Sequence, residues 1–444
     1  MNTLDELRAG RLHGARELRL SFGLTNFPEE IFELADSLEV LDLSGNQLES
    51  LPDMLPRLHR LRVLFCSGNP FRVLPEVLGR CPQLEMVGFK SCRIESVPAE
   101  ALPPRLRWLI LTDNRIGRLP AAIGRCGRLQ KLMLAGNLLD TLPAELARCT
   151  RLELLRIAAN RLVALPGWLL KMPRLSWLAY AGNPFCLGLE VDRKARIRVP
   201  DVSWGGLEME RVLGEGASGV IHQARWGADG AGRDVAVKCF KGAVTSDGLP
   251  GNEMAVCLDS GRHPGLIPVL GRLGDHPEGV AGLVMERIDP AFRTLAGPPS
   301  RASCTRDVYA PDQCLPARAV LRLAADMAGA AAHLHARHIL HGDLYAHNIL
   351  YRPDDGRALL GDFGAASFIP PDDPELAEAL QRLEVRAFGC LLEELVEHCD
   401  GSDPSGTITP ALVTLRDRCL QPDPAARPRF AELVEALQAV GDAP

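Results

Sequence analysis

Four short motifs in the second half of the chain contain the residue types that hold phosphate groups and divalent cations. They are, in order, Leu213-Gly214-Glu215-Gly216-Ala217-Ser218-Gly219-Val220, Val235-Ala236-Val237-Lys238, His341-Gly342-Asp343-Leu344-Tyr345-Ala346-His347-Asn348 and Asp362-Phe363-Gly364. Glycines let a backbone approach phosphates closely, a lysine neutralises them, and carboxylate and amide oxygens suit Mg²⁺. One motif alone is weak evidence, but four in this order predict a site for a nucleoside triphosphate, its metal ions and an incoming hydroxyl.

The elements around these motifs must bring them together from distant parts of the sequence. The pattern predicts a strand, the glycine turn, a second strand, the strand ending at Lys238, a helix, and then mainly helices. This order and the four motifs resemble the protein kinase family, which implies an α+β bilobal domain over residues 207–440. The stretch from Cys419 to Pro428 also resembles a late kinase signature, and Glu384 is expected at the start of the central helix of the second lobe.

The resemblance implies a role for each residue of the site. Lys238 would neutralise the α- and β-phosphates of ATP, and Glu253 is the carboxylate expected to hold it. Asp343 would accept or orient the proton of the hydroxyl, while Asn348 and Asp362 would bind Mg²⁺. The other expected ATP contacts are Leu213, Gly214, Gly216, Gly219, Val220, Ala236 and the hinge backbone of Glu286 and Ile288.

Three departures from the kinase pattern concern the substrate. Gly342 replaces the arginine that usually precedes the catalytic aspartate, so control through a phosphorylated activation loop is not expected. Tyr345 stands where Ser/Thr kinases place Lys, and His347 stands where Tyr kinases place Arg, so neither substrate class is marked. Only 22 residues lead from Asp362 to Glu384, without an Ala-Pro-Glu sequence. The platform that grips a peptide substrate is therefore expected to be short or absent.

Two other functions stay open beside an ATP- and Mg-dependent protein kinase. The sequence His341-Gly342-Asp343-Leu344 with Asn348 also resembles the catalytic loop of aminoglycoside and choline phosphotransferases, which act on small molecules. The second of these alternatives is a scaffold that binds ATP without catalysis. The glycine-rich loop, the strand ending at Lys238 and the region of Arg427 favour a protein kinase. Ser/Thr is expected ahead of Tyr as the residue phosphorylated, although no motif marks either class.

The first half of the chain is a repeat array. Its starting leucines lie 23, 23, 22, 23, 23 and 23 residues apart, and they are Leu38, Leu61, Leu84, Leu106, Leu129, Leu152 and Leu175. The pattern L-x-x-L-x-L-x-x-N-x-L resembles the leucine-rich repeat family, which implies an α/β solenoid over residues 1–185. The eighth position after each leucine is Asn in six of the seven units and is expected to hydrogen-bond the backbone. Residues 186–206 lose the pattern and are expected to form a connector.

An apolar stripe is expected on the outward face of the repeat strands. Its members include Phe65, Trp108, Ile110, Met133 and Trp177. Neighbouring side chains in such a stripe can shield one another, or they can form a docking surface for a protein partner, a substrate or the second half of the chain. We expect that the repeats recruit a protein, and that they select the substrate that the short activation segment no longer holds.

Bulk composition narrows the compartment and the partners. The 444 residues are 46% hydrophobic, with no apolar run long enough to span a membrane, so a cytoplasmic protein is expected. The 13 cysteines include no Cys-x-x-Cys pair, which argues for reduced thiols. Residues 1–200 hold 28 Lys and Arg against 21 Asp and Glu, whereas the remainder holds 22 against 35, so the halves should attract. The basic residues are scattered, which argues against a nucleic-acid groove.

Overall fold

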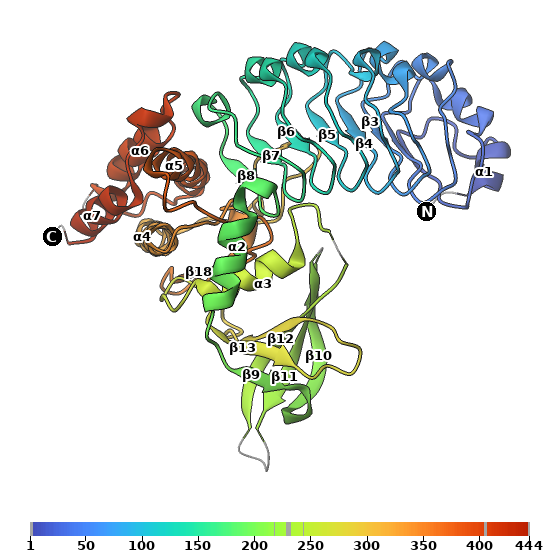
Figure 1. Ribbon diagram of the computed structural model, residues 1–444. Coiled ribbons are helices and arrows are strands. Elements are labelled where there is room, and N and C mark those ends of the chain that lie inside the picture. Colours follow the sequence, from blue (N-terminus) through green and yellow to red (C-terminus); the bar gives the residue numbers. More distant parts are fainter. Residues whose placement is uncertain (1–2, 217, 228–231, 243, 404–405, 443–444) are drawn as a thin grey trace. The chain divides into compact units, whose positions relative to one another are not determined.

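The computed structural model describes residues 3–216, 218–227, 232–242, 244–403 and 406–442 (Figure 1). The chain divides by compactness into two units. One comprises Met1–Arg174 and Asn183–Phe185, and the other comprises Leu175–Gly182 and Cys186–Pro444. Among the described helices, none is long and apolar enough to cross a membrane.

The repeats form a parallel sheet of short strands in chain order, which confirms the predicted solenoid. Its strands are β1 (Glu17–Arg19), β2 (Val40–Asp42), β3 (Val63–Phe65), β4 (Met86–Gly88), β5 (Trp108–Ile110), β6 (Lys131–Met133), β7 (Leu154–Arg156) and β8 (Trp177–Ala179). The register follows the repeat, so that Leu41 lies opposite Leu64 and Leu109 lies opposite Leu132. These central side chains are fully buried and form the solenoid core.

A ladder of buried amides holds successive repeats together, as the sequence predicts. The Nδ2 of Asn137 donates to the carbonyls of Leu111 at 2.9 Å and Leu134 at 3.0 Å, and its Oδ1 accepts from the N–H of Ile116 at 3.0 Å. Each amide therefore satisfies backbone groups that a strand-to-loop turn leaves unpaired. The thiol of Cys92, which replaces Asn in one repeat, donates to the carbonyl of Cys66 at 3.4 Å.

Opposite the strands, the chain of each repeat returns through a 3₁₀ turn. Prolines cap several of these turns because their fixed backbone angle ends strand pairing. The 3₁₀ segments are η1 (Glu29–Leu34), η2 (Leu55–Arg57), η3 (Glu76–Arg80), η4 (Ala99–Ala101), η5 (Ala121–Arg125), η6 (Ala144–Arg148) and η7 (Leu169–Lys171). Helix α1 (Leu4–Arg8) precedes β1 and is stabilised by a capping box between Thr3 and Glu6.

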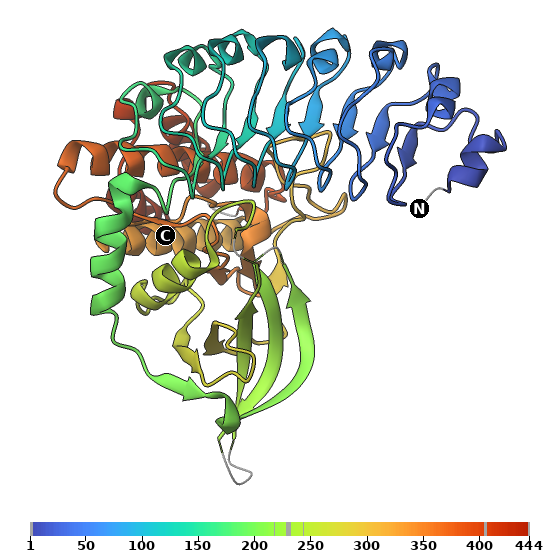
Figure 2. The same ribbon diagram turned by 45° about the vertical axis from the view of Figure 1, so that its right-hand side comes forward.

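The second unit contains a twisted, mainly antiparallel sheet of six strands, seen from a second side in Figure 2. Its order is β10-β11-β12-β14-β13-β9, and the strands are β9 (Asp201–Ser203), β10 (Leu207–Glu215), β11 (Gly219–Trp226), β12 (Arg233–Phe240), β13 (Val269–Gly274) and β14 (Gly282–Glu286). Helix α3 (Pro250–Asp259) follows β12 in sequence, with Pro250 in its first turn. The strands therefore follow the predicted order and are joined by the predicted helix.

The expected connector over residues 186–206 differs from an open linker. Helix α2 (Pro184–Arg196) fills its first part, and Arg193 bonds Asp259 of α3 at 3.0 Å. Strand β9 then pairs with β13, and Val202 enters the apolar core of the sheet. The charged stretch gave no sign of a strand in the sequence, because Val202 is the one residue of β9 that contributes a side chain to the core.

The rest of the second unit is mainly helical. Its elements are α4 (Ala317–Ala336), α5 (Pro374–Glu397), α6 (Ile408–Cys419), α7 (Phe430–Gly441), the sheet β15 (Arg293–Thr294), β17 (Ile349–Tyr351) and β18 (Ala358–Leu360), and the pair β16 (Ile339–Leu340) and β19 (Ser367–Phe368). Helix α5 begins at Pro374 rather than at Glu384, because Asp373 caps it by accepting from the N–H of Leu376 at 3.0 Å. Only residues 369–373 separate β19 from this helix.

Candidate active site

The glycine-rich loop joins β10 to β11, and its three glycines have different surroundings. Apart from the adjacent residues of the chain, no described atom lies within 4 Å of a Cβ built on Gly214 or Gly216, so these two positions leave open space beside the loop. A Cβ on Gly219 would meet the carbonyl oxygen of Cys239 at 2.3 Å. Gly219 is therefore required by the packing of β11 on β12, whereas Gly214 and Gly216 suit a closely approaching phosphate. Ala217 of the same loop lies outside the described residues.

The predicted lysine and glutamate form a buried ion pair. Lys238 of β12 contacts the Oε1 of Glu253 on α3, and their side chains are 13% and 2% exposed. Burial alone would lower the pKa of Lys238, but the carboxylates of Glu253 and Asp362 outweigh it and raise that pKa. Lys238 therefore keeps its positive charge and can neutralise phosphate groups.

The aspartate and asparagine of residues 341–348, the expected catalytic loop, are held against each other. The Nδ2 of Asn348 donates to the backbone oxygen of Asp343 at 2.9 Å and to its Oδ2 at 2.8 Å. His341 fixes the turn, since its Nδ1 accepts from the N–H of Asp343 at 3.3 Å and its Nε2 lies 2.9 Å from the oxygen of Gly361. Because Nδ2 of Asn348 points at Asp343, its Oδ1 is the atom left to face a cation.

Asp362 has the backbone and the exposure of a ligand-binding residue. Its φ is +51°, a left-handed conformation that few residues other than glycine adopt, and its Oδ1 accepts from the N–H of Gly364 at 3.1 Å. The residue is exposed, while Phe363 beside it is buried. The oxygens of Asp362 and Asn348 form a hard donor set of the kind that Mg²⁺ prefers, so the residues fit that cation.

The remaining expected ATP contacts lie on the strands around the glycine-rich loop. Leu213 is exposed on β10, Val220 is half-buried on β11, and Ala236 is buried on β12. Ala236 pairs with Met285, the residue before Glu286, so β12 and the end of β14 are adjacent. Ile288 follows β14 and is half-buried. Contact of these residues with a nucleotide stays a prediction.

The catalytic loop has a buried anchor whose role the sequence did not show. Glu384 of α5 accepts from the N–H of Gly342 at 2.6 Å, and its other oxygen lies 2.7 Å from Nε2 of His335. Burial opposes its charge, but the contact with His335 prevails and lowers the pKa of Glu384. The sequence placed Glu384 in a helix, but only the fold shows that its carboxylate reaches the loop before Asp343.

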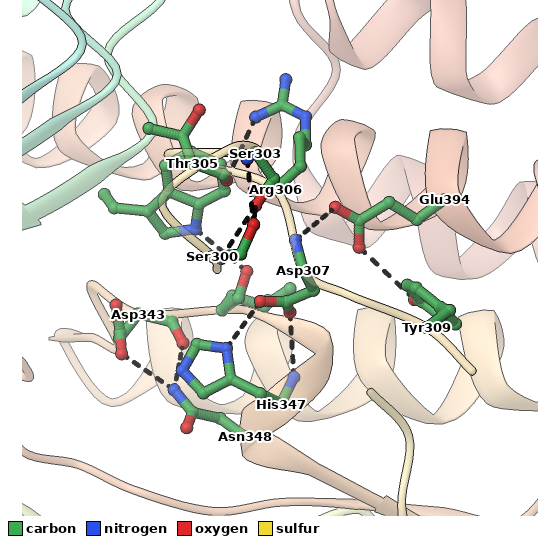
Figure 3. Close-up of polar contacts among 12 residues, drawn as sticks. Ser300, Ser303, Thr305, Arg306, Asp307, Tyr309, Asp343, His347, Asn348 and Glu394 are labelled. Carbon is green, nitrogen blue, oxygen red and sulfur yellow. Dashed lines mark hydrogen bonds and ion pairs between the residues drawn. The ribbon is translucent and has the colours of Figure 1, made fainter. Parts of the chain in front are cut away.

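A second anchor, Asp307, comes from a stretch that contains no motif. Its two carboxylate oxygens accept from the N–H of His347 at 2.9 Å and contact Nδ1 of the same residue at 2.8 Å (Figure 3). Behind it, Glu394 of α5 contacts the N–H of Asp307 and the hydroxyl of Tyr309, each at 3.4 Å. Burial would lower the pKa of His347, but the hydrogen bond and charge of Asp307 raise it.

Glu394 is expected to make stability depend on pH. Burial, and then the charge of Asp307, raise its pKa to about 8. A carboxyl group with a raised pKa stabilises the fold while protonated, and that stability is lost as pH rises from the unfolded value through the folded one. Between pH 6 and 8 the loss approaches ~1.36 kcal/mol per pH unit. Glu394→Gln should remove this slope, as measured by chemical denaturation across that range.

His347 makes the free energy of unfolding fall with pH in the same direction. The contribution of Glu394 is therefore isolated by comparing Glu394→Gln with a control variant. The raised pKa of His347 also means that its stabilisation is lost as pH rises through the folded value. Glu397→Gln, at an exposed position of the same helix, is the matched control and should leave the slope as in the unaltered protein. Equal slopes for Glu394→Gln and Glu397→Gln would contradict the prediction.

The apolar stripe of the repeats is partly self-shielded, and one expected member lies elsewhere. Phe65, Trp108, Ile110 and Met133 are half-buried, and the indole N–H of Trp108 lies 3.4 Å from the sulfur of Met133. Trp177 is only 1% exposed and belongs to the second unit, where its ring stacks on Tyr345. The expectation that Trp177 faces a protein partner is therefore wrong, because the catalytic loop covers its ring.

Comparisons with known proteins agree with this division of the chain. Residues 207–397 match the family model described as protein tyrosine and serine/threonine kinase. Residues 104–162 and 37–58 match two models described as leucine rich repeat. The chain thus combines leucine-rich repeats with a region that matches the protein kinase family.

One solved structure is similar in sequence to part of the chain. It is an LRR protein of Leptospira interrogans, 26% identical over 41% of this chain, with a TM-score of 0.34. The chain spans 52% of that protein's length. The kinase assignment therefore depends on the family match and on the geometry of the site.

Proposed function

We propose that the chain transfers the γ-phosphoryl group of ATP, bound with Mg²⁺, to a Ser or Thr hydroxyl of a protein. The observation that carries the proposal is the convergence of the Lys238–Glu253 ion pair with the oxygens of Asp343, Asn348 and Asp362. The three parts, Lys238 with Glu253, Asp343 with Asn348, and Asp362, come from separate stretches of the sequence. Together they supply a cation for phosphates, a base for a hydroxyl and ligands for a metal ion.

Each residue of the site has a distinct task in this proposal. Lys238, kept charged by Glu253, would neutralise the phosphates, and the open loop at Gly214 and Gly216 would cover them. Asp343, fixed by Asn348, would accept or orient the proton of the incoming hydroxyl. Bound Mg²⁺ would offset the negative charge of the triphosphate. Catalysis would then come mainly from positioning and charge neutralisation.

The preference for Ser or Thr over Tyr is supported by the surroundings of His347. In the resemblance to protein kinases, tyrosine kinases place an arginine at this position. Here His347 contacts Asp307 through both its backbone N–H and its ring. This arrangement commits the side chain to the loop rather than to a substrate, which leaves no marker of a tyrosine kinase at this position.

A protein partner is proposed for the repeats. The half-buried apolar residues Phe65, Trp108, Ile110 and Met133 have the character of a protein contact surface. Substitution of Trp108 by Glu should abolish capture of that partner in a pull-down while leaving transfer to a generic protein intact.

We place the protein in the cytoplasm, since ATP is available there and the 13 free cysteines suit a reducing compartment.

The test is transfer of labelled phosphate from ATP by the purified full-length chain with Mg²⁺. We expect label on the chain itself or on a generic protein such as casein, and phosphoamino acid analysis should show phosphoserine or phosphothreonine. Label that appears only on small hydroxylated or amino compounds would assign the chain to the small-molecule phosphotransferases. Binding of ATP without any transfer would make it a scaffold.

A further inference from the structure

The strand β8, which continues the repeats in sequence, packs on the catalytic loop of its own unit. The indole N–H of Trp177 donates to the backbone oxygen of Leu344 at 3.1 Å. Its ring stacks on Tyr345, with centroids 4.1 Å apart and planes 8° from parallel. Leu344 and Tyr345 directly follow Asp343, so Trp177 fixes both the backbone and the side chain of the residues that come after the proposed base.

A second contact reaches the segment that follows Asp362. The hydroxyl of Tyr180 donates to the backbone oxygen of Phe368 at 3.1 Å, and the N–H of Tyr180 donates to Oγ of Ser367 at 3.4 Å. Burial raises the pKa of Tyr180 well above its usual value, so the hydroxyl keeps its proton and remains a donor. Trp177 and Tyr180 therefore connect the catalytic loop to β19, the strand that leads out of Asp362-Phe363-Gly364.

Gly342 gives an independent sign that β8 belongs beside the catalytic loop. Its φ is +71°, and a Cβ at this position would lie 2.6 Å from the backbone oxygen of Leu178 and 2.8 Å from that of Ala365. No larger side chain fits without displacing one of these backbones. The arginine that kinases usually place here is therefore replaced by the backbone of residue 178.

The segment after Asp362 has almost no residue that could be phosphorylated. From Asp362 to Leu383 the only hydroxyl-bearing residue is Ser367. Ser367 is fully buried in β19 and faces the backbone of Tyr180. A phosphate group cannot be added there without unpacking β19, and the arginine that would bind such a group is absent.

We propose that Leu175–Gly182 is a built-in positioning element, which holds the catalytic loop and the segment after Asp362 in their working arrangement in place of a phosphorylated activation loop. The inference rests on the proposed kinase function. It makes Trp177 and Tyr180 positioning residues, because they act on Asp343 and Asp362 through Leu344, Tyr345 and Phe368. It also means that the kinase part includes residues 175–182 of the last repeat, well before the expected start at residue 207.

The test compares full-length variants of two tryptophans, Trp177 of β8 and Trp168 of the preceding repeat. Trp177→Ala should lower kcat roughly tenfold to a hundredfold, because the residues beside the base lose their fixed position, while KM for ATP changes little. Trp177→Phe should recover most of the activity, since a ring can still stack on Tyr345. Trp168→Ala, at a half-buried position outside the element, should match the unaltered chain. Phosphatase treatment should leave the activity of the unaltered chain unchanged.

Amide hydrogen exchange tests the element independently of activity. In Trp177→Ala, the amides of residues 341–345 and 365–369 should exchange faster than in Trp168→Ala, with no comparable change elsewhere. Tyr180→Phe, which removes one hydroxyl, is the milder variant if Trp177→Ala does not fold. Equal exchange and equal kcat in the Trp177 and Trp168 variants, or loss of activity on phosphatase treatment, would overturn the inference. An unaltered chain that transfers no phosphate would instead refute the proposed function. The exchange comparison would still decide whether Leu175–Gly182 holds the catalytic loop.

Discussion

Asp343→Asn is expected to lower kcat by roughly two to four orders of magnitude, the usual contribution of a positioned general base. The substitution keeps the size of the side chain, and an amide oxygen can still accept from Nδ2 of Asn348, which lies 2.8 Å from the native carboxylate. The negative charge and the proton-accepting group are lost. Steady-state transfer from ATP to a generic protein measures the effect, with the thermal unfolding midpoint as the check on folding.

The binding of nucleotide should survive this change, because Lys238 and Asp362 remain. Titration with a fluorescent ATP analogue in the presence of Mg²⁺ should therefore give a Kd close to that of the unaltered chain. If Asp343→Asn retained kcat within tenfold while folded, Asp343 would not be the base. An unaltered chain that binds nucleotide as tightly as the variant and transfers equally little phosphate would identify a scaffold.

Motif order was enough to predict which residues of the candidate active site lie together. Lys238 and Glu253 form an ion pair across β12 and α3, and Asn348 bonds Asp343 within one loop. Such contacts follow from strand and helix order, because each residue lies at a fixed place in its element. The repeat array was equally predictable, since an amide such as that of Asn137 meets equivalent backbone groups in each regular repeat.

Contacts that depend on the tertiary fold could not be read from the sequence. Trp108 and Trp177 occupy equivalent places in two repeats, two residues after a starting leucine. In the structure, Trp108 is half-buried and Trp177 is stacked on Tyr345. The repeat pattern alone carries no information on which strand meets the catalytic loop. The only sequence sign was Gly342, whose missing side chain makes room for β8.

The catalytic loop is held from three directions. Glu384 of α5 binds the N–H of Gly342, Asp307 binds His347, and Trp177 binds Leu344. In each case a side chain bonds the loop's backbone, so the arrangement does not require a phosphate group on the segment after Asp362. A loop fixed in this way is already organised before substrate arrives, which is the condition under which electrostatic catalysis is efficient.

Asp362→Asn is expected to reduce turnover to the background level, because it removes the carboxylate proposed to bind the metal ion without disturbing the backbone. Asparagine tolerates the left-handed conformation at this residue, where φ is +51°, and its amide oxygen can still accept from the N–H of Gly364. A variant that retains the fold but not the charge therefore separates metal binding from structure. The measurements are kcat and the Mg²⁺ concentration that gives half-maximal activity.

Raising Mg²⁺ or replacing it by Mn²⁺ should recover only a small part of the activity of Asp362→Asn, since neither restores the carboxylate. The matched control is Asp372→Asn, which changes an exposed aspartate in the same segment and should behave as the unaltered chain. Loss of activity in both variants would indicate a general effect of charge on the segment. Full activity in a folded Asp362→Asn protein would mean that the metal ion is held elsewhere, and the site built on Lys238, Asp343 and Asp362 would have to be abandoned.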